Sequence, residues 1–238
     1  MRLPTRWKLA SSVAGIIALG WIGVVTRPAE ATVIQINSRA TFDALGAIVP
    51  VDWGAFGPTG TSISTPDSRT IGGITVGVAS SQGVLARLDE GSGFTGTFAV
   101  GDHLLADAGS KSDTFIVSFG SPVRGFGTQI DAHYISGAFT GFVEVFTASN
   151  VKIFTANFSG NGTTAEDNSA PFVGVESSAA DISFAEFFVN QTLPLLPAGA
   201  LAINRLDVLV PEPATLAVFA PALMGIMWLR RRRRRDQQ

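Results

Sequence analysis

The chain has 238 residues, contains no cysteine and carries a formal net charge of −2 at neutral pH. The absence of cysteine excludes disulfides, thiolate metal sites and cysteine nucleophiles. The near-neutral total hides two basic ends, because residues 32–210 hold 7 basic and 16 acidic side chains, a net charge of −9. This acidic middle disfavours DNA and RNA as partners, since phosphate binding needs a positive surface.

Residues 1–31 have the three parts of a signal peptide. A basic start is followed by an apolar run over residues 9–25, and Ala29 and Ala31 supply the small-x-small pattern that a signal peptidase cuts after. We therefore expect export through the inner membrane, with a mature chain that begins near Thr32. The run is long for a signal peptide, so an uncleaved N-terminal anchor is the alternative.

Residues 32–209 predict one all-β domain. Short runs rich in Val, Ile, Phe and Thr alternate with Gly, Ser, Asn and Asp, which is the pattern of strands and turns. The pattern predicts two antiparallel sheets packed face to face, a β-sandwich of the jelly-roll kind, with one short helical turn capped by Ser38 and ending at Gly46. The expected strands are Thr32–Asn37, Gly73–Ser80, Val84–Leu88, Phe94–Phe98, Asp113–Phe119, Arg124–Asp131, Phe139–Ala148, Val151–Phe158, Phe172–Ser177, Ile182–Val189 and Ala202–Leu209.

The stretch FVEVFTASNVKIFTANF predicts a β-hairpin. Two strand-like runs flank Ser149-Asn150, a two-residue loop in which asparagine accepts the left-handed backbone. Pairing Ala148 with Val151 then places Glu144 opposite Thr155.

Metal-ligating residues are few in this sequence. Asp131 and His133 would share one face of a strand, but no further ligands accompany them, so we interpret them as a surface pair; His103 is the other histidine. The acidic loops Asp89-Glu90 and Glu166-Asp167-Asn168 could hold a structural calcium ion, although they lack an EF-hand or repeat-type spacing. We expect no cofactor, and a solvated acidic loop is the alternative to calcium.

No residue pattern predicts an enzyme. The chain has no Gly-x-Ser-x-Gly nucleophile motif. Glu144, Glu176 and Glu186 each stand alone on an expected strand, whereas retaining glycosidases need two carboxylates about 5–5.5 Å apart. A glycan-binding site is the alternative, and Trp53 and Tyr134 are the candidate contacts because they are the one Trp and the one Tyr of the expected mature domain.

Residues 210–235 form an unusual C-terminal tail. Pro211-Glu212-Pro213 precedes an apolar run, Ala214–Leu229, which spans about 24 Å as a helix against about 30 Å for a hydrocarbon core. A basic stop follows, and by the positive-inside rule it marks a cytoplasmic end. The stop consists of Arg230, Arg231, Arg232, Arg233, Arg234 and Arg235.

This order of parts resembles the PEP-CTERM sorting signal of Gram-negative and related environmental bacteria, with Pro211, Glu212 and Pro213 at the motif. The resemblance implies that a membrane-embedded exosortase recognises the motif and processes the tail. It also implies a place at the cell surface or in the extracellular matrix of exopolysaccharide-producing species. The single transmembrane helix would then be a transient sorting segment, consistent with its short apolar run.

Residues 94–209 also resemble the extracellular domain of a subset of PEP-CTERM proteins. The matching stretches are GTFAVGDHLLAD, FIVSFGSPVRGFGTQIDA, GAFTGFVEVF, APFVGVESSAADISFAEFFV and LAINRLDV. In SPVRGFG we expect a strand, a turn opened by proline and a second strand, in which Gly125 and Gly127 allow a close backbone approach. The resemblance supplies no catalytic residues.

Three functions follow as hypotheses. The first is a non-enzymatic structural or adhesive protein of the cell surface or matrix, associated with exopolysaccharide. The second is a carbohydrate-binding module with a defined glycan site. The third is a surface hydrolase, which would need two carboxylates that converge in the folded chain.

Overall fold

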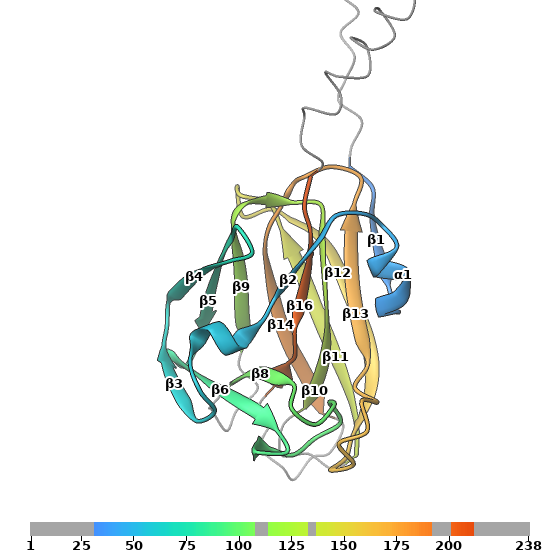
Figure 1. Cartoon of the computed structure of the whole chain (residues 1–238). Helices are drawn as coiled ribbons and strands as arrows, with labels where there is room; N and C mark the ends of the chain where they lie inside the picture. Colours follow the sequence, from blue (N-terminus) through green and yellow to red (C-terminus); the bar gives the residue numbers. More distant parts are fainter. Residues whose placement is uncertain (1–30, 108–113, 133–136, 192–200, 212–238) are drawn as a thin grey trace, which may run out of the picture. The chain divides into compact units, whose positions relative to one another are not determined.

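The computed structural model describes residues 31–107, 114–132, 137–191 and 201–211. These residues form two β-sheets, one short α-helix, α1 (Arg39–Asp43), and one 3-10 helix, η1 (Trp53–Phe56) (Figure 1). The prediction of two sheets with almost no helix is confirmed, whereas jelly-roll connectivity stays a prediction. The segments predicted to be a signal peptide and a transmembrane helix fall outside the described residues, apart from Ala31. No helix within the described residues has the length and apolar character to span a membrane.

The larger sheet has ten strands. Its main order is β1-β13-β10-β15-β8-β6-β3, while β16 pairs with β10 and β2, and β7 pairs with β6. All its pairings are antiparallel except that of β6 with β7. The strands are β1 (Val33–Ile36), β2 (Ile48–Val51), β3 (Thr61–Ser64), β6 (Val84–Glu90), β7 (Gly93–Phe94), β8 (His103–Asp107), β10 (Gly125–Ala132), β13 (Phe172–Ser177), β15 (Leu201–Ile203) and β16 (Leu206–Leu209).

The smaller sheet has six strands in the order β12-β11-β14-β9-β5-β4, all antiparallel. In Figure 1, β2, β16 and β8 of the larger sheet lie in front of β11, β12 and β14 of the smaller one. The strands are β4 (Asp67–Ile71), β5 (Ile74–Ser80), β9 (Phe115–Val123), β11 (Gly137–Phe146), β12 (Lys152–Gly162) and β14 (Ile182–Gln191).

One hydrophobic core joins the two sheets. Phe126 of β10 reaches across to Phe119 of β9 and Phe187 of β14, with ring centroids 5.8 Å and 5.9 Å apart. Aromatic rings in such tilted and edge-on contacts fill a core with little wasted volume. Seven phenylalanines of the domain are buried in this core: Phe56, Phe115, Phe119, Phe126, Phe139, Phe158 and Phe187.

The outer face of the ten-stranded sheet is covered by two satellite clusters. One forms under α1 from Ile36, Phe42, Phe172 and Leu209. The other forms under the segments that follow β7 and precede β13; it contains Phe94, Phe98, Leu104, Ala106, Ala170 and Ala202. Neither cluster includes a residue of the six-stranded sheet. Among the described residues, no such cluster of buried hydrophobic side chains lies on the outer face of the six-stranded sheet.

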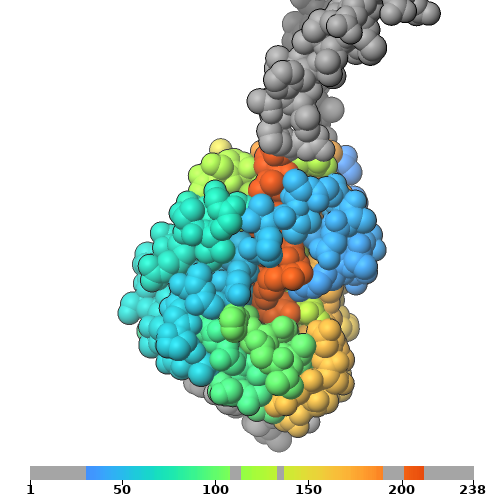
Figure 2. Space-filling view, viewed as in Figure 1, coloured from blue at the N-terminus to red at the C-terminus, as the bar shows by residue number. Residues whose placement is uncertain are grey.

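The two ends of the described domain lie together in the larger sheet. The blue N-terminal segment lies beside the orange C-terminal segment in Figure 2, in agreement with the antiparallel pairing of β2 with β16. The expected last strand is divided into β15 and β16 by Asn204 and Arg205, and of the expected strand Phe94–Phe98 only Phe94 lies in a strand, β7.

The chain crosses from one sheet to the other at Arg124, the single residue between β9 and β10. A Cβ atom on Gly125 would lie 2.5 Å from Val175 O, and one on Gly127 would lie 2.4 Å from the ring of Phe172. The predicted close backbone approach is therefore confirmed at Gly125, whereas at Gly127 a side chain, the ring of Phe172, lies over the glycine.

The hairpin of β11 and β12 has the predicted register but a different turn. Glu144 pairs with Thr155 as predicted, and Asn150 has the expected left-handed backbone, with φ of 59°. However, Thr147 N donates to Val151 O and Asn150 N donates to Thr147 O, both at 3.0 Å. The two-residue loop was therefore wrong: the loop has three residues, and a register shift at the end of β11 restores the pairing of Glu144.

The predicted helical turn is confirmed at its start. The Ser38 side chain accepts a hydrogen bond from Thr41 N, as an N-cap residue should. The helix ends at Asp43, three residues before the predicted Gly46. Because only one turn forms, the element serves to place Phe42 over the sheet.

Candidate functional site

The outer face of the six-stranded sheet carries a row of alternating aromatic and acidic side chains on β11 and β14. We call this row the aromatic–acidic strip. All its members are partly exposed, whereas the residues between them on each strand are buried. The strip consists of Phe142, Glu144, Phe146, Phe184, Glu186 and Phe188.

The strip arises from one sequence pattern that occurs twice. FVEVF in β11 and FAEFF in β14 both read Phe-x-Glu-x-Phe. The two strands are antiparallel and pair Glu144 with Glu186, so each phenylalanine of one pattern meets a phenylalanine of the other. Alternate residues of a strand point to the same face, and all six side chains therefore share the outer face. The repeated pattern is the signal that could have located this site in the sequence.

The four rings form two cross-strand stacks. Phe146 and Phe184 are nearly parallel, with centroids 4.6 Å apart and an interplanar angle of 3°. Phe142 and Phe188 stack at 5.2 Å and 13°. Two-residue steps along a strand are about 6.6 Å long, so the stacks stand about 13 Å apart with the glutamates between them.

The two glutamates have different electrostatic surroundings. Lys152 Nζ lies 2.9 Å from Glu144 Oε1, which gives Glu144 a cationic partner. Burial raises the pKa of Glu186, the negative charge of Glu144 raises it further, and Lys152 offsets part of the rise. Each glutamate is the single glutamate of its strand, as predicted, but the pairing of β11 with β14, which the sequence did not show, brings Glu144 and Glu186 together.

Trp53, one of the two predicted glycan contacts, lies in the core. Its side chain has 0% exposure, and its indole Nε1 donates to Asn204 O at 2.7 Å. A ring without exposed surface cannot stack on a sugar, so the predicted ligand contact at Trp53 is wrong. Tyr134, the other predicted contact, lies outside the described residues.

Asn204, at the break between β15 and β16, is the centre of a buried polar network. Its Nδ2 donates to Asp102 Oδ2 at 2.9 Å and to Gln129 Oε1 at 2.7 Å. Its Oδ1 accepts from Gln129 N at 3.0 Å and from Arg39 Nη2 at 3.1 Å. The side chain uses all these contacts inside the protein, and the network is therefore structural.

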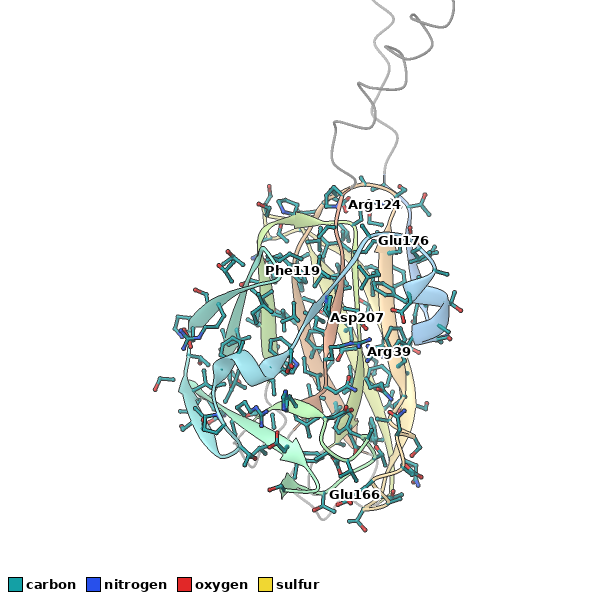
Figure 3. The ribbon with its side chains drawn as sticks, in the orientation of Figure 1. Arg39, Phe119, Arg124, Glu166, Glu176 and Asp207 are labelled. Atoms are coloured by element: carbon teal, nitrogen blue, oxygen red, sulfur yellow. The ribbon has the colours of Figure 1, made fainter. Side chains whose placement is uncertain are left out.

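Arg39 and Asp207 extend this network towards α1 and point towards each other in Figure 3. Asp207 is buried and pairs with Arg39 and with Arg205, whose Nε lies 2.9 Å away. Burial raises the pKa of Asp207, and the two arginines oppose that rise. Arg39 also lies 5.1 Å over the ring of Phe172, so its guanidinium is fixed on several sides.

His103 and Asp131 both have protein partners. His103 Nδ1 lies 2.6 Å from Asp52 Oδ1. Asp131 is 1% exposed and accepts hydrogen bonds from Thr97 N, Thr97 Oγ1 and Ala132 N. The interpretation of Asp131 as a surface residue was wrong, and His133 lies outside the described residues.

The two acidic loops considered for calcium come together at the end of the sandwich. Burial raises the pKa of Glu90 and the carboxylate of Glu166 raises it further, while Ala99 forms an isolated bridge with Asp167. Within the described ranges, no group of three or more His, Asp or Glu side chains has the arrangement of a metal site. Any cation held here would need additional oxygen ligands.

The predicted sorting motif is described only at Pro211, which is exposed. Pro211 lines a pocket of about 280 Å³ together with residues of β5, the β9 end and Val210. Glu212, Pro213 and the six arginines lie outside the described residues, as does Ala29 of the predicted cleavage site.

No protein-family model and no curated protein matches the chain. A DUF4465 family protein from Bacteroides caccae has 9% identity and a TM-score of 0.45, covering 70% of this chain and 100% of its own. CsCBM6-3 from Clostridium stercorarium, in complex with cellobiose, has 11% identity and a TM-score of 0.32, covering 65% of this chain and 99% of its own. A family 11 carbohydrate-binding module from Clostridium thermocellum, in complex with a mixed-linked tetrasaccharide, has 6% identity and a TM-score of 0.30, covering 68% and 95%.

Proposed function

We propose that the domain binds a polysaccharide on the aromatic–acidic strip after export to the cell surface or matrix. The observation that carries this proposal is the pair of partly exposed ring stacks on either side of Glu144 and Glu186. Sugar C–H faces pack on aromatic rings, while carboxylates accept hydrogen bonds from hydroxyl groups. The strip offers both kinds of contact on a rigid sheet.

The charge of the domain selects among polysaccharides. Residues 32–210 carry a net charge of −9, and the strip itself holds two glutamates against one lysine. A glycan rich in carboxylate or sulfate would be repelled. The ligand we expect is therefore a neutral polysaccharide or one that carries amino groups.

Export and sorting are part of this proposal and rest on the sequence of the two ends. The signal-peptide pattern at residues 1–31 and the Pro-Glu-Pro, apolar and arginine parts of residues 210–235 support them. An exosortase-type enzyme would be the processing partner. The bound glycan would then be the exopolysaccharide that surrounds the cell.

A binding assay with the full chain tests the proposal. The chain is purified in detergent micelles and titrated with neutral, amino-bearing and carboxylated polysaccharides. Phe146→Ala should weaken binding of a neutral or amino-bearing glycan at least about tenfold, because it removes a ring stack worth about 1.4 kcal/mol or more. Ile34→Ala is the matched control, since Ile34 is 48% exposed but lies on β1.

Equal affinity of Phe146→Ala and the unsubstituted chain would refute the strip as the binding surface. Preference for the carboxylated polysaccharide would refute the assignment of ligand charge. Circular dichroism of each variant shows whether lost binding comes from lost folding.

A surface hydrolase is the second candidate, and the pairing of Glu144 with Glu186 favours it. In retaining glycosidases the general acid is the carboxyl group with the raised pKa, and the second carboxylate acts as the nucleophile. Here Glu186 has a raised pKa, and Glu144 has Lys152 as a cationic partner. Release of reducing ends from a bound glycan by the unsubstituted chain, and its loss in Glu186→Gln with binding retained, would make the chain an enzyme. Binding without such release would leave it a binding module.

A further inference from the structure

We propose that Glu90 and Glu166 hold a calcium ion at one end of the sandwich. The site shares no residue with the aromatic–acidic strip and does not depend on glycan binding. In Figure 3, Glu166 lies at the end of the molecule opposite Arg124, and the described chain starts and finishes near Arg124 (Figure 1). The ion would join two loops that are far apart in the sequence.

Backbone hydrogen bonds bring the two loops into contact. Glu166 N donates to Gly96 O at 2.9 Å, and Ala170 N donates to Thr97 O at 3.0 Å. The loop of Glu90 thereby meets the loop of Glu166 along residues 96–99. This arrangement brings the carboxylate of Glu166 close enough to Glu90 to raise its pKa, although burial is the larger cause.

Glu90 has one carboxylate oxygen without a partner. Its Oε1 accepts from Gly96 N at 2.6 Å, but its buried Oε2 has no hydrogen-bond partner in the described part of the chain. The residue is 1% exposed, so this oxygen lies out of reach of bulk solvent. An unsatisfied buried carboxylate oxygen costs about 1–3 kcal/mol or more, which indicates that a ligand normally completes it.

Glu166 supplies the second carboxylate. Its backbone has φ of 52°, an uncommon conformation for a residue other than glycine, asparagine or aspartate. Its two carboxylate oxygens lie 3.7 and 3.8 Å from the position that a Cβ atom on Gly91 would take. Gly91 directly follows Glu90, so the Glu166 carboxylate lies over the same turn.

The surrounding charge favours a cation over an empty site. Burial raises the pKa of Glu90 to about 7 despite the Gly96 hydrogen bond, and Glu166, Asp131 and Asp102 raise it further. Asp131 is already saturated by Thr97 and Ala132, so it contributes charge rather than a ligand oxygen. A divalent cation would relieve the repulsion that a proton on Glu90 otherwise has to relieve.

Calcium fits this site better than other divalent ions. All available ligand atoms are oxygens, as calcium and magnesium require, and calcium tolerates irregular geometry with carbonyl and water ligands. Only two carboxylates are offered, so the remaining ligands must be main-chain carbonyls and water. Sites of this kind in extracellular modules bind calcium with Kd of about 10⁻⁴–10⁻³ M.

Thermal unfolding of the full chain in detergent micelles tests the site. After treatment with EDTA, addition of about 10 mM CaCl₂ should raise the Tm by about 3–10 °C, whereas MgCl₂ should have a smaller effect. The increase should disappear in Glu90→Gln and in Glu166→Gln. Asp167→Asn is the matched control, because Asp167 is an exposed neighbour in the same loop and should keep the full increase.

Two results would overturn the proposal. One is a Tm that ignores calcium in the unsubstituted chain but rises on acidification through pH 7, since Glu90 then takes only a proton. The other is an equal calcium effect in all variants, which would place the ion elsewhere. Glu166→Gln keeps the test informative if Glu90→Gln fails to fold, because Glu166 is only partly buried.

Discussion

The outer faces of the two sheets present similar residues in opposite situations. On the ten-stranded sheet, α1 and two loops cover Phe42, Phe98 and Phe172, which have little or no exposure. On the six-stranded sheet, the four phenylalanines of the strip stay partly exposed, and no described element forms a cluster over them. Apolar surface closed by the chain itself stabilises the fold, whereas apolar surface left open is available to a ligand.

The polar groups of the two faces differ in the same way. Asn204 in the larger sheet satisfies its whole side chain through Asp102, Gln129 and Arg39. Glu186 in the smaller sheet faces a second carboxylate, Glu144, directly across the strand pair. A polar side chain whose hydrogen bonds are all made within the protein stabilises the fold. A partly exposed carboxylate that faces another carboxylate can instead accept hydrogen bonds from a ligand.

Removal of the Asn204 side chain should show the largest effect. Asn204→Ala breaks the bonds to Asp102, Gln129 and Arg39 and leaves buried partners unsatisfied, so the free energy of unfolding should fall by about 4 kcal/mol. Urea unfolding measures the loss. Asn157→Ala is the control on the smaller sheet, where Asn157 is exposed, and should cost less than about 0.5 kcal/mol.

A loss below about 1 kcal/mol in Asn204→Ala would contradict the view that the network holds β15 and β16 in place. The stability of the larger sheet would then not depend on its internal polar contacts. A large loss in Asn157→Ala would contradict the view that exposed polar groups of the smaller sheet contribute little to stability.

The inner face of β11 should be much less tolerant than its outer face. A Cβ atom on Gly141 would lie 1.9 Å from Phe158 Cζ, because the ring covers the glycine across the strand pair. Gly141→Ala should therefore destabilise the chain by about 2–3 kcal/mol. Thr140→Ala, one residue earlier and partly exposed, should cost less than about 1 kcal/mol.

A double substitution tests the cause of this loss. In the double variant Gly141→Ala with Phe158→Leu, the smaller leucine side chain leaves room for the new methyl group. The loss of unfolding free energy in the double variant should therefore be smaller than the sum of the losses in the two single variants. Additive losses would show that the ring of Phe158 is not the obstacle.

The sequence predicted the parts of this molecule that depend on local patterns. The Ser38 cap, the register of Glu144 with Thr155 and the bounds of Phe172–Ser177 follow from short-range rules and are confirmed. Strand β8 was missed because it is buried on both faces and shows no alternation. Short β3 and β4 were missed for lack of a strong apolar run, and β2 was missed because Pro50 interrupts its apolar residues.

Features that depend on pairing between distant strands could not be predicted. The strip needs β11 beside β14 in one register, and the sequence does not state which strands are neighbours. Trp53 was interpreted as a candidate glycan contact because composition says nothing of burial. Its hydrogen-bond partner, Asn204, is 151 residues away in the sequence, so the contact that holds it in the core could not be predicted. The meeting of Glu90 with Glu166 is likewise a property of the folded loops.

The smallest expected effect concerns the pH dependence of stability at the strip. The pKa of Glu186 is raised in the folded chain, by burial first and by Glu144 second. The folded state therefore favours protonated Glu186, and this contribution is present below the ordinary glutamate pKa of about 4 and lost as pH rises through the folded pKa. The difference in unfolding free energy between the unsubstituted chain and Glu186→Gln should fall over that interval and then stay constant. Its amplitude should be below about 1 kcal/mol, because Glu186 is partly exposed and screened.

Urea unfolding at a series of pH values measures this difference, and Glu144→Gln tests its cause. Glu144→Gln removes the neighbouring charge, so the pH-dependent part should shrink while the part due to burial stays. A difference that instead rises with pH would mean that ionised Glu186 is stabilised by a partner in the folded chain. The strip would then be satisfied internally like the Asn204 network, and the contrast between the two faces would not hold for their carboxylates.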